Sequence, residues 1–192
     1  MIINIKGLSG AGKSTVVRKL ACGAIETGSI VSERDGRRIA STYARSGWSR
    51  PVTVIGCYDR AGGGCDALRN TDGGLARALA LAADAESRGH HVLLEGNQLS
   101  FDAAATRLLS ETGNLRIILL LVPISRCAEN LRRRRKMADS ALAGLNNRLE
   151  HEAQRLAGIL PGLSALSGDA LVPVAGPNAA VALVEGWMSA SG

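Results

Sequence analysis

The sequence predicts an α/β fold, in which a parallel sheet of five strands is flanked by helices and carries a small antiparallel hairpin insertion. Three observations predict this fold class. The chain starts with a strand, a glycine-rich loop and a helix; alternation of strand and helix returns in the second half; and the predicted strands are strongly apolar. With 192 residues, 46% of them hydrophobic, the chain fits one domain over residues 1–192.

The first predicted elements are a short apolar strand at residues 2–6 and a helix over residues 13–26. The pattern then changes, because short strand-like runs and the turn signal Asp35-Gly36 predict two or three antiparallel strands before residue 58. We interpret residues 29–70 as an insertion that contacts the substrate.

The later elements alternate again between helix and strand. In order, they are a helix at 72–88, a strand at 91–95, a helix at 100–112, a strand at 115–122, helices at 124–136 and 140–160, a strand at 171–174 and a helix at 178–188. Because parallel strands need crossover connections, this alternation predicts a sheet covered by helices on both faces.

The basic residues of the chain are mostly arginines. Lys and Arg together number 23 against 17 Asp and Glu, which gives a formal charge of +6, and 19 of the 23 are arginines. Guanidinium groups suit two-point contacts with phosphate. A general compositional preference for arginine explains the excess equally well, so charge alone does not establish a nucleic-acid partner.

The four cysteines are Cys22, Cys57, Cys65 and Cys127, and they lie far apart without a zinc-binding or C-x-x-C spacing. This usage is typical of a reduced protein without a structural metal. The chain also has no run of about 18 apolar residues and no long apolar segment at its start. We therefore expect a cytoplasmic protein with no membrane partner.

Residues 7–14 read Gly-Leu-Ser-Gly-Ala-Gly-Lys-Ser and match the phosphate-binding pattern G-x-x-x-x-G-K-[S/T], the P-loop or Walker A motif, between a predicted strand and helix. Glycines let the backbone curl so that its amides point at a phosphate, and the helix N-terminus adds partial positive charge. Lys13 should reach the β- and γ-phosphates, and the Ser14 hydroxyl should ligate magnesium. The motif thus predicts ATP and Mg2+ as cofactors. The expected nucleotide-binding residues of this segment are Gly7, Ser9, Gly10, Ala11, Gly12, Lys13, Ser14 and Thr15.

Absent motifs narrow the class of P-loop protein. The chain lacks the N-K-x-D pattern that reads guanine and the L-S-G-G-Q signature of transporter ATPases, and it is too short for the coupling elements of a motor. The remaining class at this length is the small kinases. We therefore expect a P-loop NTPase fold of the nucleoside-monophosphate-kinase-like type.

Two further charged features are expected at the same site. Glu95 ends an apolar strand, where parallel strands meet their ligand, so it should face magnesium or the acceptor hydroxyl. Residues 124–140 form an arginine-rich lid, in which Arg132 and Arg135 follow apolar residues by four positions and should point inward to ATP phosphates. The two arginines between them should point to solvent. The alternative is a solvated helix end that complements its own dipole.

The insertion combines arginines with three of the five aromatic residues of the chain. Arginines on phosphates and bases stacked on aromatic rings are a general way of holding an unstacked nucleotide, although packing within the hairpin explains the aromatics equally well. Asp59, at the end of a predicted strand, is the best candidate for the base that accepts a hydroxyl proton. The expected substrate-binding residues are Arg37, Arg38, Tyr43, Trp48 and Tyr58.

Residues 56–66, Gly-Cys-Tyr-Asp-Arg-Ala-Gly-Gly-Gly-Cys-Asp, resemble a segment of a group of bacteriophage P-loop kinases that includes the 5-hydroxymethyluridine DNA kinases. The likeness extends from the P-loop through this segment to the Leu-Leu-Glu-Gly strand and the lid, which is most of the chain. It implies that Asp59, Cys65 and Asp66 lie on the acceptor side. Where the family often has a second cysteine this chain has Gly62, which argues against a metal or disulfide role for Cys65.

The resemblance implies an ATP-dependent kinase that phosphorylates the hydroxymethyl group of 5-hydroxymethyluracil in DNA during phage thymine hypermodification. A base inside a duplex would have to leave the stack to react. Two alternatives remain from the residues themselves: a kinase for a nucleoside, nucleotide or other small hydroxyl metabolite, and a non-catalytic nucleotide-dependent binding module. The expected catalytic residues are Lys13, Asp59, Asp66, Glu95 and Arg132.

Overall fold

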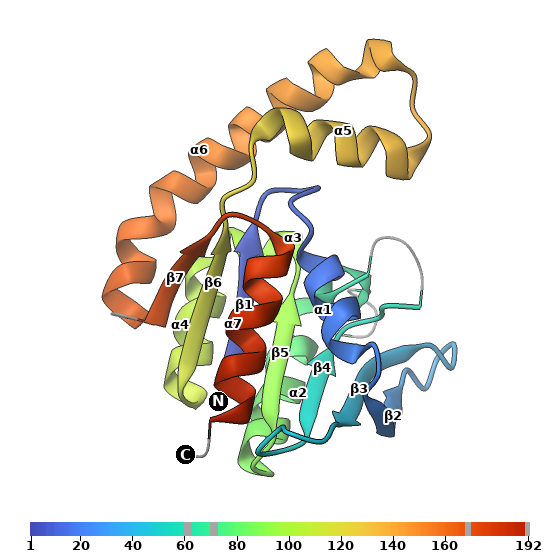
Figure 1. Ribbon diagram of the computed structural model, residues 1–192, viewed down its shortest axis with the longest axis vertical. Helices are drawn as coiled ribbons and strands as arrows, with labels where there is room; N and C mark the ends of the chain where they lie inside the picture. Colours follow the sequence, from blue (N-terminus) through green and yellow to red (C-terminus); the bar gives the residue numbers. More distant parts are fainter. Residues whose placement is uncertain (60–62, 70–72, 168–169, 191–192) are drawn as a thin grey trace.

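The computed structural model describes residues 1–59, 63–69, 73–167 and 170–190, and these residues contain one seven-stranded sheet (Figure 1). The strands lie in the order β2-β3-β4-β5-β1-β6-β7. They are β1 (Ile2–Gly7), β2 (Ile25–Val31), β3 (Arg38–Ala44), β4 (Val52–Ile55), β5 (His91–Glu95), β6 (Leu115–Leu120) and β7 (Leu171–Val174). Neighbouring strands from β4 across to β7 run parallel, whereas β2 and β3 are antiparallel additions.

The α/β class is confirmed, but the sheet differs from the predicted one with five strands. β2 and β3 join the edge of the same sheet and extend it to seven strands. β4 was expected in the antiparallel insertion; it does pair antiparallel with β3, but on its other side it pairs parallel with β5, with Val54 beside Leu93. The helix predicted over residues 13–26 is too long, since it ends at Ala21 and residues 25–31 form β2 instead. Gly23, with a φ of 80°, terminates it.

Helices cover both faces of the sheet. They are α1 (Lys13–Ala21), α2 (Gly74–Ser87), α3 (Asn97–Ser100), α4 (Ala103–Thr112), α5 (Ile124–Arg135), α6 (Leu142–Ser167) and α7 (Pro177–Ser189), with short 3-10 turns η1 (Cys65–Ala67) and η3 (Asp139–Ala141). α1 and α7 pack together on one face, and α2 and α4 on the other (Figure 1). α6 continues through Pro161, past its predicted end. The predicted helix start at Asp72 lies outside the described residues.

The central strands end together because they are paired in register. Ile5 of β1 lies beside both Glu95 of β5 and Ile118 of β6. We call the edge where the parallel strands end the carboxyl edge, and the opposite edge the amino edge. β1 also contains a fully buried charged residue, Lys6, whose Nζ donates to the Leu99 carbonyl oxygen at 2.6 Å and to Thr106 Oγ1 at 2.9 Å.

Strand β3 runs from the carboxyl edge to the amino edge, opposite to β4. At its start, the Gly56 amide donates to the Ile39 carbonyl oxygen at 2.8 Å, which places this end beside the end of β4. The connection from β3 to β4 therefore lies at the amino edge. There the Ser49 amide donates to the carbonyl oxygen of Met188, in the last turn of α7, at 2.8 Å.

Helices α5 and α6 form a hairpin above the carboxyl edge (Figure 1). Cys127, Ala128 and Leu131 of α5 share one buried core with Leu145 and Leu149 of α6. This packing fixes the hairpin over the ends of the strands. None of the described helices, including α6 with its 26 residues, combines the length and apolarity needed to cross a membrane.

Candidate active site

The glycine-rich loop of residues 7–14 joins β1 to α1 at the carboxyl edge. Gly12 is its N-cap residue and has a φ of 97°, which side-chain-bearing residues rarely adopt. A Cβ atom at Gly12 would also lie 2.5 Å from Cγ of Pro177. No side chain caps α1, so the partial positive charge at its N-terminus is available to an anionic ligand.

Lys13 is held inside the loop. Its side chain is buried, and Nζ donates to the carbonyl oxygens of Gly7 at 2.8 Å and Leu8 at 3.1 Å. Burial lowers the pKa of Lys13, while the nearby carboxylate of Glu95 partly offsets the effect. An ammonium held by carbonyl oxygens alone would gain from an anionic ligand in the loop.

Ser14 and Glu95 form a hydrogen-bonded pair of oxygen-bearing side chains beside Lys13. Ser14 Oγ donates to Glu95 Oε1 at 2.8 Å, and Glu95 is only 2% exposed. Burial raises the pKa of Glu95, although Lys13 and the Ser14 hydrogen bond act in the opposite direction. Gly64 allows this arrangement, because a Cβ there would lie 2.4 Å from Glu95 Oε1. A hydroxyl and a carboxylate are ligands that magnesium prefers.

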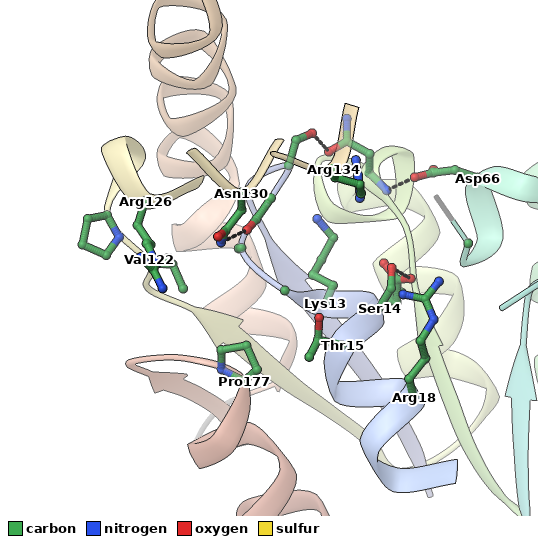
Figure 2. A pocket seen from close by; sticks show the side chains of 18 of the residues that line it. Lys13, Ser14, Thr15, Arg18, Asp66, Val122, Arg126, Asn130, Arg134 and Pro177 are labelled. Carbon is green, nitrogen blue, oxygen red and sulfur yellow. Dashed lines mark hydrogen bonds between the residues drawn. The ribbon is translucent and has the colours of Figure 1, made fainter. Parts of the chain in front are cut away.

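A pocket of about 610 Å3 opens above these residues (Figure 2). Its walls come from the glycine-rich loop, the ends of β5 and β6, the turn η1, helix α5 and the connection from β7 to α7. The lining residues are Ser9, Gly10, Ala11, Gly12, Lys13, Ser14, Thr15, Arg18, Gly63, Asp66, Glu95, Asn97, Val122, Pro123, Arg126, Asn130, Arg134, Ala175 and Pro177. Apart from Gly7, the structure thus brings every predicted nucleotide-binding residue of the loop to one cavity.

One face of α5 supplies polar side chains to this pocket. Arg126, Asn130 and Arg134 follow one another at intervals of four residues and all line it (Figure 2). Asn130 Nδ2 donates to the Gly10 carbonyl oxygen at 2.9 Å, which attaches α5 directly to the loop. Arg126 lies near Val122 and Pro177 at one end of the pocket, and Arg134 lies at the other.

Arg132 and Arg135 were expected to point to the ATP phosphates, but neither lines the pocket, whereas Arg134 does. Of the four consecutive arginines only Arg132 is half-buried, and the other three are exposed. Arg132 contacts Glu129 at 2.8 Å and Asp139 at 2.8 Å instead. The buried stripe of α5 has two polar flanks, and the sequence does not distinguish which flank faces the loop. Arg132 lies on one flank and Arg134 on the other.

The two acceptor-side carboxylates occupy different positions. Asp66 lines the pocket, and its carboxylate accepts hydrogen bonds from the amides of Asn97 at 2.5 Å and Gln98 at 3.1 Å, at the start of α3. Asp59 has a side chain that is 52% exposed, lies 3.5 Å from Arg38 and does not line the pocket. Asp66 is therefore the carboxylate that shares a cavity with Lys13.

Two of the predicted aromatic contacts lie close to the site. Tyr43 and Tyr58 line a smaller cavity of about 280 Å3 together with Arg18 and Asp59. Arg18 belongs to both cavities, and its Nε donates to the Tyr58 carbonyl oxygen at 3.5 Å. Burial, followed by the charge of Glu95, raises the pKa of Tyr58 well above its ordinary value.

Trp48 does not belong to this site. It lies in the connection at the amino edge, packs against the core and has the Arg45 guanidinium 6.0 Å from its ring centroid. The prediction failed because it grouped residues by their proximity in sequence. β4 separates Trp48 from Tyr58, because it runs from the amino edge, where Trp48 lies, to the carboxyl edge, where Tyr58 follows it.

Cys65, Arg37 and Arg38, which were also expected to contact the substrate, do not line the pocket that contains Lys13. Cys65 is 5% exposed, and Sγ donates to the Ile55 carbonyl oxygen at 3.7 Å, so its contribution is internal packing. Arg37 contacts Asp35 at 3.0 Å, and Arg38 contacts Glu26 at 2.7 Å. Both arginines border a separate hollow near the carboxyl edge. Arg60, counted among the arginines of the insertion, lies outside the described residues.

Sequence reasoning missed several residues of the pocket. Arg18 follows Ser14 by one helical turn, and this spacing could have indicated that both side chains lie on one face of α1. Asn97, Arg126 and Asn130 have no motif around them and emerge only from the packing of α5 and α3. Glu152 of α6 supports the loop from behind, since its Oε2 accepts from the Ser9 amide at 2.9 Å. The sequence does not indicate this role of Glu152, because the residue lies among the buried leucines of α6 and belongs to no recognisable motif.

Comparisons with known proteins indicate a relative in a phage. No model of a known protein family matches the chain. A "5-hmdU DNA kinase" of Pseudomonas phage PaMx11 is 30% identical over 146 residues, which cover 76% of this chain and 75% of the relative. Among solved structures, an uncharacterized protein from Eubacterium ventriosum ATCC 27560 has a TM-score of 0.53 at 12% identity, over 100% of this chain and 99% of that one. The latter likeness concerns the fold alone. From the extent and identity of the first match, the chain belongs to the family of phage 5-hmdU DNA kinases.

Proposed function

We propose that this protein is an ATP-dependent kinase of the P-loop NTPase fold that phosphorylates the hydroxymethyl group of 5-hydroxymethyluracil in DNA. The observation that carries the proposal is the meeting of Lys13, Ser14, Glu95 and Asp66 in one pocket beside a helix N-terminus. The name of the phage relative supports the acceptor. The pocket supports the transfer of a phosphoryl group.

The triphosphate would bind between the loop and α5. Amides at the start of α1 and the ammonium of Lys13 would hold the β- and γ-phosphates from below. Arg126 and Arg134 would approach from above, on a helix that Asn130 attaches to the loop. Ser14 and Glu95 would hold magnesium, and when bound this ion would neutralise and orient the phosphates.

The acceptor would enter beside Asp66. The hydroxymethyl oxygen attacks the γ-phosphorus, the bond from that phosphorus to the bridging oxygen breaks, and ADP leaves. Asp66 would accept the hydroxyl proton, since two amides occupy only part of the acceptor capacity of its carboxylate. Arg18 and Arg134, which line the same pocket, would stabilise charge on the transferred group.

A direct test offers γ-labelled ATP and magnesium with three acceptors: a DNA oligonucleotide containing 5-hydroxymethyluracil, the same oligonucleotide with thymine, and the free 5-hydroxymethyl nucleoside. We expect label in the first oligonucleotide and none in the second. Equal labelling of the free nucleoside would instead indicate that the protein is a small-molecule kinase. Absence of label in all three, while ATP binds, would refute the proposal.

A further inference from the structure

The last turn of α5 and its cap residue form a run of five cations, from Arg132 to Lys136. Their electrostatic surroundings differ. Arg132 and Arg133 are both paired with Glu129, and Arg132 also contacts Asp139. Within the described residues, Arg134, Arg135 and Lys136 have no carboxylate within ion-pair distance. Positive charge therefore accumulates at the very end of the helix.

The positive charge at the end of α5 extends into the pocket, because Arg134 lines it. Partial burial in the pocket lowers the pKa of Arg134, and the charges of Arg135 and then Arg18 lower it further. Guanidinium groups that approach one another repel unless anions lie between them. The triphosphate would supply anions only on the inner side, whereas Arg135 and Lys136 are exposed and do not line the pocket.

Lys136 also has an uncommon backbone conformation. Its φ is 53°, and it is the only residue other than glycine with positive φ in the described ranges. It occupies the left-handed cap of α5, a position where glycine or asparagine is normally preferred. The backbone conformation of Lys136 is therefore less favourable than that of a glycine in the same position would be.

The end of α5 lies at the acceptor end of the pocket. Figure 2 shows Arg126 beside Val122 and Pro177, and Arg134 on the side of Asp66. α5 thus runs from the part of the pocket beside α7 toward the part beside the acceptor carboxylate. Arg135 and Lys136 follow directly and lie outside the pocket on that side.

We propose that Arg135 and Lys136 bind the phosphate backbone of the acceptor DNA strand, next to the base that enters the pocket. This inference rests on the proposed function. It means that the end of α5 makes the enzyme prefer DNA over a free nucleoside. The partner is an unpaired strand or a strand with an extruded base, because Asp66 and Glu95 lie inside a cavity that a stacked base does not reach. If these cations only complemented the dipole of α5, their loss would affect helix stability and leave DNA binding unchanged.

The test compares two double variants of equal charge change. In Arg135→Gln with Lys136→Asn, both cations are removed and asparagine retains the tolerance for the left-handed cap. The matched control is Arg50→Gln with Arg107→Gln, which are exposed and lie at the amino edge and on α4. Binding of a fluorescent oligonucleotide containing 5-hydroxymethyluracil is measured by anisotropy without ATP, over a range of salt concentrations.

We expect the α5 variant to bind the oligonucleotide about tenfold more weakly, with a salt slope reduced by about 0.7 for each phosphate that the variant no longer neutralises. The control should bind like the wild type, and ATP affinity should be equal in all three proteins. Unchanged affinity and salt slope in the α5 variant would overturn the inference, as would an equal reduction in the control. Because the assay measures binding only, a wild type that binds through α5 but labels no DNA would refute the proposed function and not this DNA-binding role.

Discussion

The two ends of β3 carry similar residues and have different surroundings. At the carboxyl edge, Arg38 and the nearby Tyr58 lie among charged groups beside the site. At the amino edge, Arg45 contacts Glu185 of α7 at 2.8 Å, and Trp48 packs against the core. Arginine and aromatic residues alternate through both regions, so composition does not separate them. The direction of a strand decides which of its ends can serve a site.

The comparison implies that substitutions at the carboxyl edge reduce activity, whereas those at the amino edge reduce stability. The largest effect is expected for Lys13→Ala. Phosphoryl transfer should fall by about a thousandfold or more, because Lys13 would stabilise the transferred charge. The free energy of unfolding in urea should not decrease, because the substitution removes an ammonium that is costly to bury. Near-normal transfer in Lys13→Ala would show that this pocket is not the active site.

The second prediction separates the two carboxylates on the acceptor side. Asp66→Asn should reduce transfer by about a hundredfold while ATP still binds, as expected for loss of a general base. Asp59→Asn should have a smaller effect, because Asp59 pairs with Arg38 outside the pocket. Single-turnover transfer and ATP titration would be measured for both. A larger loss in Asp59→Asn would return the role of base to Asp59.

The third prediction compares the two flanks of α5. Arg134→Ala should lower transfer by about tenfold to a hundredfold, because a cation of the pocket is lost. Arg132→Ala should leave transfer nearly unchanged and cost at most about 1 kcal/mol of unfolding free energy, since its partners are partly exposed. The measurement is kcat/KM for ATP in both variants. Equal losses of kcat/KM in the two variants would contradict the conclusion that Arg134, and not Arg132, faces the pocket.

At the amino edge, Trp48→Ala should show the reverse pattern. Removal of a half-buried indole should lower the free energy of unfolding by about 2 kcal/mol. Transfer by the folded fraction should remain at the level of the wild type. Urea unfolding and transfer below the transition would be measured together. A selective loss of DNA phosphorylation would restore Trp48 to the substrate site.

Much of the core was predictable from the sequence, because apolar runs and turn signals act locally. β1, β5 and β6 coincide closely with predicted strands, and the glycine-rich loop lies between β1 and α1 as its motif indicates. The pairing of β4 was not predictable in the same way. Its four residues look alike whether the neighbouring strand is parallel or antiparallel.

Within the site, residues of the motif were predictable and residues brought by packing were not. Lys13 and Ser14 follow from the loop, and Glu95 follows from the rule that strand ends meet the ligand. Arg134 was expected to face solvent because Arg132 and Arg135, and not Arg134, follow apolar residues by four positions. Arg132 instead contacts Glu129 within α5 and Asp139 in the turn between α5 and α6, and the contact with Asp139 depends on that turn.

The buried ammonium of Lys6 makes the stability of the protein depend on pH. Burial lowers the pKa of Lys6 from 10.5 to about 7, although Asp102 partly opposes the shift. Between these two values the unfolded chain holds the proton and the folded protein releases it, so the free energy of unfolding rises with pH; below about pH 7 the full cost of burial remains. From pH 7 to 8.5 we expect a gain of about 1–2 kcal/mol over a Lys6→Met variant in urea unfolding, and parallel pH profiles would contradict it. A fold built around a desolvated base is thus most robust in mildly alkaline solution.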